Sequence, residues 1–367
     1  MSATSSVSAA STSSLTSQMR AICILEKDTN LDTLNVWSFP ILSDDQKTII
    51  MNRSPLNSNS TVLSKQYSDL SLNNSLFVCS KFDDCYVYSM SRKVKLVNSS
   101  VTDVNLVVVS GEYWMKKYEK YLEVMMNVLI ENQLSPLPML EVYLRLFSKG
   151  TYKDQITADL FSDPRAAKVG NLSMLIKSFG EESVRIWSAL MLKKRIVIYH
   201  ENISELLEIM SAIPSLVLHR QQTDFIRPFV NFDSPIETKD LTESNFYCAG
   251  TLDRNMRNNT KFYDLFVDAT TKRTNVNESQ TDEFKFTKIH KDLLKVVTSE
   301  EIATMENTHV IKQVSQKTKE LIQKLETVKE QNDHQLSLDI IKGLQLQPDL
   351  EKFLYGVAVS ECMITSL

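Results

Sequence analysis

The pattern of apolar and polar positions changes near residue 110. Before it, short apolar runs alternate with polar joints, at residues 19–25, 36–39, 76–79, 86–90 and 104–109. Runs of this length and spacing predict the strands of an antiparallel sheet. The polar segment 26–30 predicts a turn, the acid pairs Asp44-Asp45 and Asp83-Asp84 fall in predicted polar turns, and the Asn- and Ser-rich residues 52–75 predict a long surface loop.

Two helices are expected next. Apolar and aromatic residues recur at spacings of four and three between residues 111 and 132, which predicts an amphipathic helix that Ser110 can cap. A second helix is expected to begin near Pro136 and to end before Gly150, since proline favours the first helical turn and glycine the position after the last. Strands followed by two helices form a compact first module.

The second half begins with a connecting segment, residues 151–170, and then predicts helices on either side of Gly180. A strand at 195–199, a helix at 204–213 and an apolar run at 216–218 form a βαβ pattern, which predicts two parallel strands with a right-handed crossover. Further strands are expected at 246–250 and 265–267. We therefore predict a mixed α/β protein with an antiparallel first sheet and a partly parallel second sheet.

The last third is predicted to be helical. Between residues 308 and 331, apolar side chains follow one narrow stripe, and Lys and Glu occupy the opposite side. Such a helix can pack on its own domain or on a partner's coiled coil, and packing on its own domain is the commoner use of an amphipathic helix. A final helix is expected at 349–363. The predicted organisation is a Ser/Thr-rich disordered tail at 1–18, a first module at 19–157 and a second at 158–367.

Composition and charge exclude several classes of function. The net charge is −4, whereas nucleic-acid binders usually carry a basic face. The chain has only 7 glycines and neither phosphate-cradling glycine motif, and its histidines lack metal-ligand spacing, so we expect no cofactor and no metal. The five cysteines are expected to be free and buried. With no signal peptide or transmembrane segment, we expect a cytoplasmic protein that meets membranes only through partners.

A histidine and a pair of lysines near residue 195 are candidate functional residues. His200 follows a predicted buried strand, where open α/β sheets often bind ligands, but no accompanying site motif supports an enzyme. The basic residues Lys193 and Lys194 lie at a predicted helix end, where cations are favoured by the helix dipole. They could also contact an acidic partner surface, and the two roles are compatible.

Several segments resemble the DENN-domain family. Residues 189–200, ALMLKKRIVIYH, resemble the helix–strand joint of its core, and residues 213–221, 247–250 and 265–268 resemble the strands that follow. The hairpin 25–40 also resembles the family, so the likeness spans about residues 19–363. It implies a longin-like (uDENN) module followed by a DENN module.

The resemblance implies guanine-nucleotide exchange on Rab-family GTPases at late endosomes, without a cofactor or a covalent step. The residues around Leu218 and at 227–228 depart from the family's pattern. This leaves open whether the chain catalyses exchange or only binds the GTPase. The alternative is a non-catalytic scaffold subunit associated with the Commander endosomal recycling complex through coiled-coil subunits. The candidate partner-binding residues are Glu26, Lys27, Asp28, Thr29, Asn30, Trp37, Lys193 and Lys194.

Overall fold

The structure is a computed structural model that describes residues 18–57 and 61–364. Most of the tail expected at residues 1–18 lies outside these ranges. The first sheet has the strand order β2-β1-β5-β4-β3, and all neighbours are antiparallel. Its strands are β1 (Met19–Asp28), β2 (Thr33–Phe39), β3 (Ser75–Phe82), β4 (Cys85–Lys93) and β5 (Val101–Ser110).

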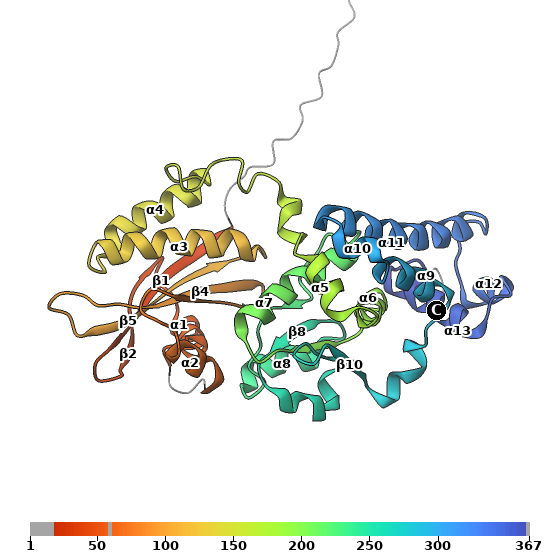
Figure 1. Ribbon diagram of the computed structural model, residues 1–367, viewed down its shortest axis with the longest axis horizontal. Helices are drawn as coiled ribbons and strands as arrows, with labels where there is room; N and C mark the ends of the chain where they lie inside the picture. Colours follow the sequence, from red (N-terminus) through yellow and green to blue (C-terminus); the bar gives the residue numbers. More distant parts are fainter. Residues whose placement is uncertain (1–17, 58–60, 365–367) are drawn as a thin grey trace, which may run out of the picture.

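Helices cover both faces of this sheet (Figure 1). On one face lie α3 (Met115–Glu131) and α4 (Pro136–Lys149), and on the other lie α1 (Asp44–Arg53) and α2 (Thr61–Ser68). Successive side chains of β1 point to opposite faces of the sheet. Ile22 and Ile24 belong to the main core on one face, whereas Cys23 and Leu25 pack with residues of α1 on the other. As predicted, α4 ends at Gly150, whose φ of 67° suits glycine.

Four predictions are wrong for the first unit, by which we mean the first sheet and the helices α1–α4 that cover it. Asp44 and Asp45 lie in the first turn of α1, where a capping box between Ser43 and Gln46 starts the helix. The loop expected at 52–75 contains α2. The helix expected from residue 111 begins at Met115, because β5 continues through Ser110 and a short bend follows. The turn expected at 26–30 is also shorter, since β1 extends to Asp28.

The second sheet has the order β10-β9-β6-β8-β7. Strand β6 pairs in parallel with β8 and β9, and β7 pairs in parallel with β8, whereas β10 is antiparallel to β9. The strands are β6 (Ile196–Tyr199), β7 (Ile226–Arg227), β8 (Cys248–Thr251), β9 (Leu265–Asp268) and β10 (Arg273–Val276). The mixed α/β class, with an antiparallel sheet and a partly parallel one, is confirmed.

The strand predicted at 216–218 is wrong. After α7 (Ile203–Ala212) the chain continues into the 3-10 helix η2 (Ile213–Val217), with Pro214 in its first turn. All five residues of η2 are buried, and the long helix α11 (Asn307–Glu330) packs against them, so an apolar run marks a buried helical turn here. Around the second sheet also lie η1 (Pro164–Lys168), α5 (Leu172–Phe179), α6 (Glu182–Met191), α8 (Pro235–Glu243), η3 (Arg254–Asn258) and η4 (Thr260–Phe262).

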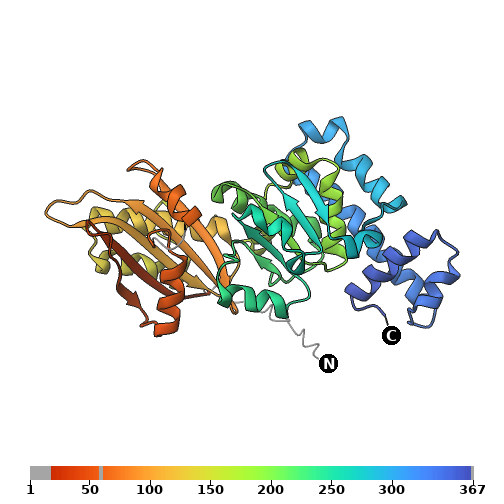
Figure 2. The ribbon, with the colours of Figure 1, turned by 90° about the horizontal axis from the view of Figure 1, so that it is seen from below.

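The C-terminal part is helical, as expected. It comprises η5 (Glu278–Phe284), α9 (Lys288–Val297), α10 (Glu300–Thr304), α11 (Asn307–Glu330), α12 (Leu338–Gly343) and α13 (Pro348–Ser360). The apolar stripe of α11, including Val310, Val314, Leu321 and Leu325, is buried against its own unit. Figure 2 shows α12 and α13 at the opposite end of the molecule from the first sheet.

Two general features complete the fold. Within residues 18–57 and 61–364, no helix combines the length and the apolar composition that crossing a membrane requires. The five cysteines are all free thiols, but the expectation that all are buried is wrong, because Cys85 is half-buried and Cys362 is exposed. Cys362 follows the last turn of α13.

Candidate partner-binding groove at the junction of the two sheets

Helix α7 of the second unit packs against β3, an edge strand of the first sheet. Its first turn is held by Gln66 of α2, which accepts a hydrogen bond from the Ile203 backbone N–H at 2.9 Å and donates to the Glu201 carbonyl at 2.7 Å. Near its other end, the Tyr113 hydroxyl donates to the Met210 carbonyl at 3.3 Å. The first unit therefore fixes both ends of α7.

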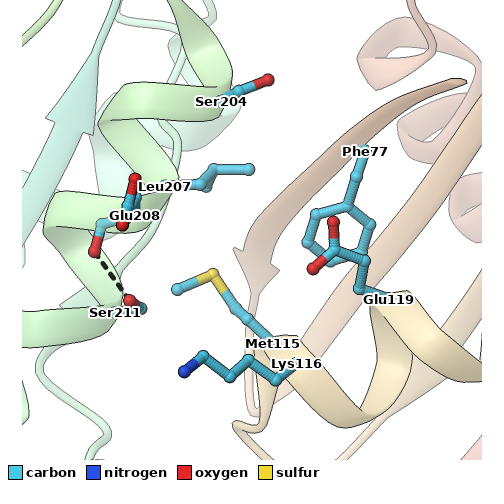
Figure 3. Close-up of a pocket in the computed structure, with 8 residues that line it drawn as sticks. All are labelled: Phe77, Met115, Lys116, Glu119, Ser204, Leu207, Glu208 and Ser211. Carbon is cyan, nitrogen blue, oxygen red and sulfur yellow. Dashed lines mark hydrogen bonds between the residues drawn. The ribbon is translucent and has the colours of Figure 1, made fainter. Parts of the chain in front are cut away.

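A groove of about 290 Å³ lies between α7 and the start of α3. Figure 3 shows Met115 and Leu207 projecting from opposite walls, with Phe77 of β3 beside them. These three side chains are buried or half-buried and form the apolar lining of the groove. Polar side chains form its rim: Lys116 and Glu119 on α3, and Ser204, Glu208 and Ser211 on α7. The groove thus combines apolar area with charged edges from both units, as protein-binding sites commonly do.

The charged residues of the rim influence one another, as the carboxyl of Glu119 shows. Desolvation in the groove raises the pKa of Glu119, the neighbouring charge of Glu123 adds to the effect, and Lys116 opposes it. A second groove of about 570 Å³ shares Phe77, Lys116 and Glu119 with the first and continues along α3 toward Arg92. Because they share these residues, the two grooves form one continuous surface, which we call the junction groove.

The wall of the junction groove that α7 forms is held at both ends by local contacts. The Asn202 side chain caps α7 by accepting hydrogen bonds from the backbone N–H groups of Ser204 at 2.9 Å and Glu205 at 3.1 Å. At the other end of α7, Gly170 passes so close that an added Cβ would lie 2.3 Å from the Ser211 carbonyl oxygen. Only glycine fits at this crossing, so the chain entering the second unit is locked against α7.

Of the predicted partner-binding residues, those of the hairpin lie at the far end of the first sheet. The Asp28 carboxylate accepts hydrogen bonds from the backbone of Asn30 at 2.8 Å and Asp32 at 3.1 Å, which holds the turn. Lys27 donates to the Leu56 carbonyl at 3.2 Å, and the Thr29 N–H donates to the Ser100 carbonyl at 3.0 Å. Glu26 is half-buried, and burial raises the pKa of its carboxyl.

Trp37, Lys193 and Lys194 occupy separate environments. Trp37 is half-buried, pairs with Ile24 across the strands and packs on the main core. Lys194 pairs with Glu283, whereas Lys193 lines a different groove of about 530 Å³ that also includes Arg220 and Phe246. The structure therefore does not bring the hairpin residues together with the two lysines.

His200 is held by local contacts. Its Nδ1 accepts from the Asn202 backbone N–H at 3.0 Å, and its Nε2 lies 3.2 Å from the Glu205 carboxylate. Through these contacts the His200 imidazole helps to hold the start of α7 in position. Among the described residues, no group of three or more His, Cys, Asp or Glu side chains is arranged to hold a metal ion.

Sequence reasoning did not single out the groove residues Phe77, Met115 and Leu207. Each belongs to an element whose apolar pattern predicts only core positions, and they meet because α7 packs beside β3 and α3. No local sequence signal marks them.

Comparisons with known proteins agree with this architecture. The family model described as SPA, stabilization of polarity axis, matches residues 170–278, which carry all five strands of the second sheet. DENN domain-containing protein 10 of Dictyostelium discoideum is 32% identical over 365 residues, covering 93% of this chain and 96% of the relative. The protein of the same name from Homo sapiens is 26% identical over 360 residues, covering 95% and 97%. The chain belongs to the DENN domain-containing protein 10 family.

Proposed function

We propose that the chain regulates Rab-family GTPases, as a guanine-nucleotide exchange factor in late endosomal vesicle trafficking. The observation that carries this proposal is the 32% identity to a DENN domain-containing protein over 93% of the chain. In that family the fold implies Rab binding, and the junction groove supplies a surface to which both units contribute.

The junction groove suits this role physically. Exchange needs a protein that binds the nucleotide-free conformation of the GTPase better than the nucleotide-bound one, so that binding energy shifts the population toward release. A rigid surface serves this better than a flexible one, because it cannot adapt equally well to both conformations. The capped helix α7 and the close crossing at Gly170 provide such rigidity.

A nucleotide-release assay across a panel of Rab GTPases loaded with fluorescent GDP tests the proposal. We expect accelerated release from at least one Rab, and a loss of about tenfold or more in the variant Lys116→Glu/Glu208→Lys, which reverses charges on both walls. Lys312→Glu, on the exposed side of α11, is the matched control and retains activity. No acceleration and no binding to any nucleotide state would rule out both the exchange and the binding roles.

We also propose module boundaries at residues 19–157 and 158–367. Their support is the position of the two sheets, which end and begin on either side of the connector 151–170. Limited proteolysis tests the boundary, with first cleavage expected in the connector. Early cleavage inside either sheet would contradict it.

A second candidate is a non-catalytic scaffold subunit recruited to late endosomes with the Commander complex, through its coiled-coil subunits. The observation that favours it is the hairpin 28–34, whose tip carries exposed residues far from the junction groove. Affinity purification followed by mass spectrometry should recover Commander subunits with the wild-type chain. Recovery of the chain alone would count against this function.

A further inference from the structure

A groove of about 440 Å³ lies where α8 approaches the end of β3, and residues of both units line it. We call it the α8 groove. Its volume falls within the range of about 300–1,000 Å³ that small-molecule sites occupy. Its basic side chains are Arg53 and Lys81 of the first unit and Arg227 and Lys239 of the second. Among the described residues that line the α8 groove and the junction groove, none is shared, so the two are separate sites.

Two of these cations, one from each unit, meet at a single oxygen atom. The Lys81 ammonium donates a hydrogen bond to the Asp224 carbonyl at 2.9 Å, and the Arg227 guanidinium donates to the same carbonyl. Their charged nitrogens therefore lie close together, and the two positive charges repel each other. Burial and the nearby charge of Arg227 lower the pKa of Lys81, as expected for an ammonium with too little negative charge around it.

Both cations are withdrawn from solvent, whereas the carboxylates that pair with them are not. The side chains of Lys81 and Arg227 are only 6% and 11% exposed. Asp224, whose carboxylate lies 3.8 Å from the Lys81 ammonium, is 78% exposed. Asp240, 3.0 Å from the Arg227 guanidinium, is 53% exposed. Water screens such exposed carboxylates, so they offset the buried charges only in part. The carboxylate of Glu237 is little exposed, but it is already engaged in the ion pair between α1 and α8.

The α8 groove therefore holds an excess of buried positive charge, which an anionic ligand can neutralise. Lys81 and Arg227 both have N–H groups beyond those that hydrogen bonds with the described residues occupy. A phosphate group presents several anionic oxygens in different directions. It can thus accept hydrogen bonds from an ammonium and from a guanidinium at the same time.

The rest of the lining restricts the shape of the ligand. Phe82, Val230 and Ile236 give the groove an apolar wall, which can pack on the organic part of a small molecule. Asp83 and Glu243 are exposed at the rim. These carboxylates oppose a broad anionic surface more than a compact ligand that reaches the two cations below them. The lining therefore favours a small organic phosphate.

We propose that the α8 groove binds a small organic polyphosphate, with phosphate oxygens on Lys81 and Arg227 and the organic part against the apolar wall. Because the two cations come from different units, the bound ligand bridges the units and stabilises their arrangement. The site is separate from the junction groove, so the inference stands whether or not a GTPase binds there.

Isothermal titration calorimetry of the full chain with inorganic pyrophosphate and with inositol trisphosphate tests this, and we expect saturable binding. Sedimentation with phosphatidylcholine vesicles that contain phosphatidylinositol bisphosphate presents the inositol phosphate as a lipid head group. The variant Lys81→Gln/Arg227→Gln should weaken binding by about tenfold or more. The matched control is Arg254→Gln/Lys285→Gln, which neutralises two ion-paired cations outside the groove and should keep wild-type affinity.

Two milder variants test the site even if the double variant does not fold. Lys239→Glu on the exposed side of α8 should weaken binding by about threefold or more. Asp240→Asn releases Arg227 from its carboxylate and should strengthen binding by a similar factor. Asp339→Asn on α12 makes the same change in net charge and should have no effect.

No binding to any of the three probes, or wild-type affinity in both Lys239→Glu and Asp240→Asn, would overturn the proposal. Binding to the vesicles alone would support the phosphate site and identify a lipid head group as the source of the phosphate. The groove variants should leave nucleotide release from Rab GTPases unchanged, which separates this inference from the proposed function.

Discussion

Arg53 of α1 and Glu237 of α8 form a buried ion pair across the junction, with Nε and Oε1 3.2 Å apart and side chains only 8% and 10% exposed. The other oxygen of Glu237 accepts the Asn231 backbone N–H at 3.0 Å, and Arg53 also donates to the Ser80 hydroxyl at 3.3 Å. One ion pair thus joins a helix of the first unit, an edge strand and the start of α8. It makes the two units a single platform on the side of the junction where α1 approaches α8.

Breaking this pair should be costly. Glu237→Gln leaves the Arg53 guanidinium buried without its counter-charge, and removing one member of a buried pair costs roughly 3–5 kcal/mol. We expect a loss of that size in urea unfolding. The double variant Arg53→Met/Glu237→Leu should recover much of it, because neither charge is then left alone. A loss below about 1 kcal/mol in Glu237→Gln would contradict the importance of the pair.

The crossing at Gly170 gives a second test. In Gly170→Ala the new methyl group meets the backbone of Ser211 and Ala212 at 2.3–2.5 Å, so α7 or the chain beside it must move. We expect a loss of about 1–3 kcal/mol in thermal unfolding, together with reduced binding at the junction groove. The matched control is Gly343→Ala, where no atom lies within 4 Å of the new Cβ and a stability change near zero or slightly favourable is expected. Equal effects of the two substitutions would refute the close packing.

His290 should make stability depend on pH. It is fully buried, its Nδ1 accepts from the Thr287 backbone N–H at 3.1 Å, and its Nε2 lies 3.0 Å from the Ser188 hydroxyl. Because the backbone N–H can only donate, Nε2 carries the proton of the neutral ring. Burial lowers the pKa of His290 from 6.5 to about 4.

The unfolded chain therefore binds more protons than the folded chain below pH 6.5. Stability should fall as the pH drops from about 6.5 toward 4 and should lose roughly 3 kcal/mol through this group. Urea unfolding at several pH values measures it, and His290→Gln removes the contribution while keeping a donor and an acceptor. An unchanged pH slope in His290→Gln would disprove the assignment.

Glu361 anchors the C-terminal helices. Burial alone would raise the pKa of its carboxyl, but hydrogen bonds from His219 and Arg220 outweigh burial and lower it to about 2. Arg220 also donates to the carbonyls of Leu190 at 2.6 Å and Met191 at 3.0 Å, at the end of α6. The carboxylate therefore connects α13 to the joint between α6 and β6.

In Glu361→Gln this connection loses its charge, and we expect local opening of α13 to become easier by about 1–3 kcal/mol. Hydrogen exchange should accelerate in α13, whereas the first sheet keeps its protection. For the wild-type chain, this contribution should persist at pH values above about 4.5 and disappear as the pH falls toward 2. Uniform acceleration over both units would show instead that Glu361 supports global stability.

Sequence patterns predicted the elements that have a clear period. The strands of the first sheet, β6 and the long helix α11 each carry enough apolar residues in register to be recognised. Helix α1 was missed because only Ile50 and Arg53 of its ten residues are buried, so its apolar pattern is weak. The Ser43–Gln46 capping box was the signal that could have found it.

The run at 216–218 was misassigned because full burial removes the polar contrast that separates a strand from a helical turn. The junction groove could not be predicted from local sequence patterns, for a different reason. Phe77, Met115 and Leu207 come from distant parts of the chain, and each is also a plausible core residue. Only the packing of α7 beside β3 brings them together as the lining of a groove.

Hydrogen exchange on the complex with a nucleotide-free Rab GTPase, chosen from the release panel, tests the central claim most directly. We expect added protection at the start of α3, near Lys116 and Glu119, and along α7 from Ser204 to Ser211. The β1–β2 hairpin and the C-terminal helices should keep the exchange of the free chain. Protection confined to the hairpin or to α11–α13, with none in α3 and α7, would contradict the claim that the GTPase binds at the junction groove.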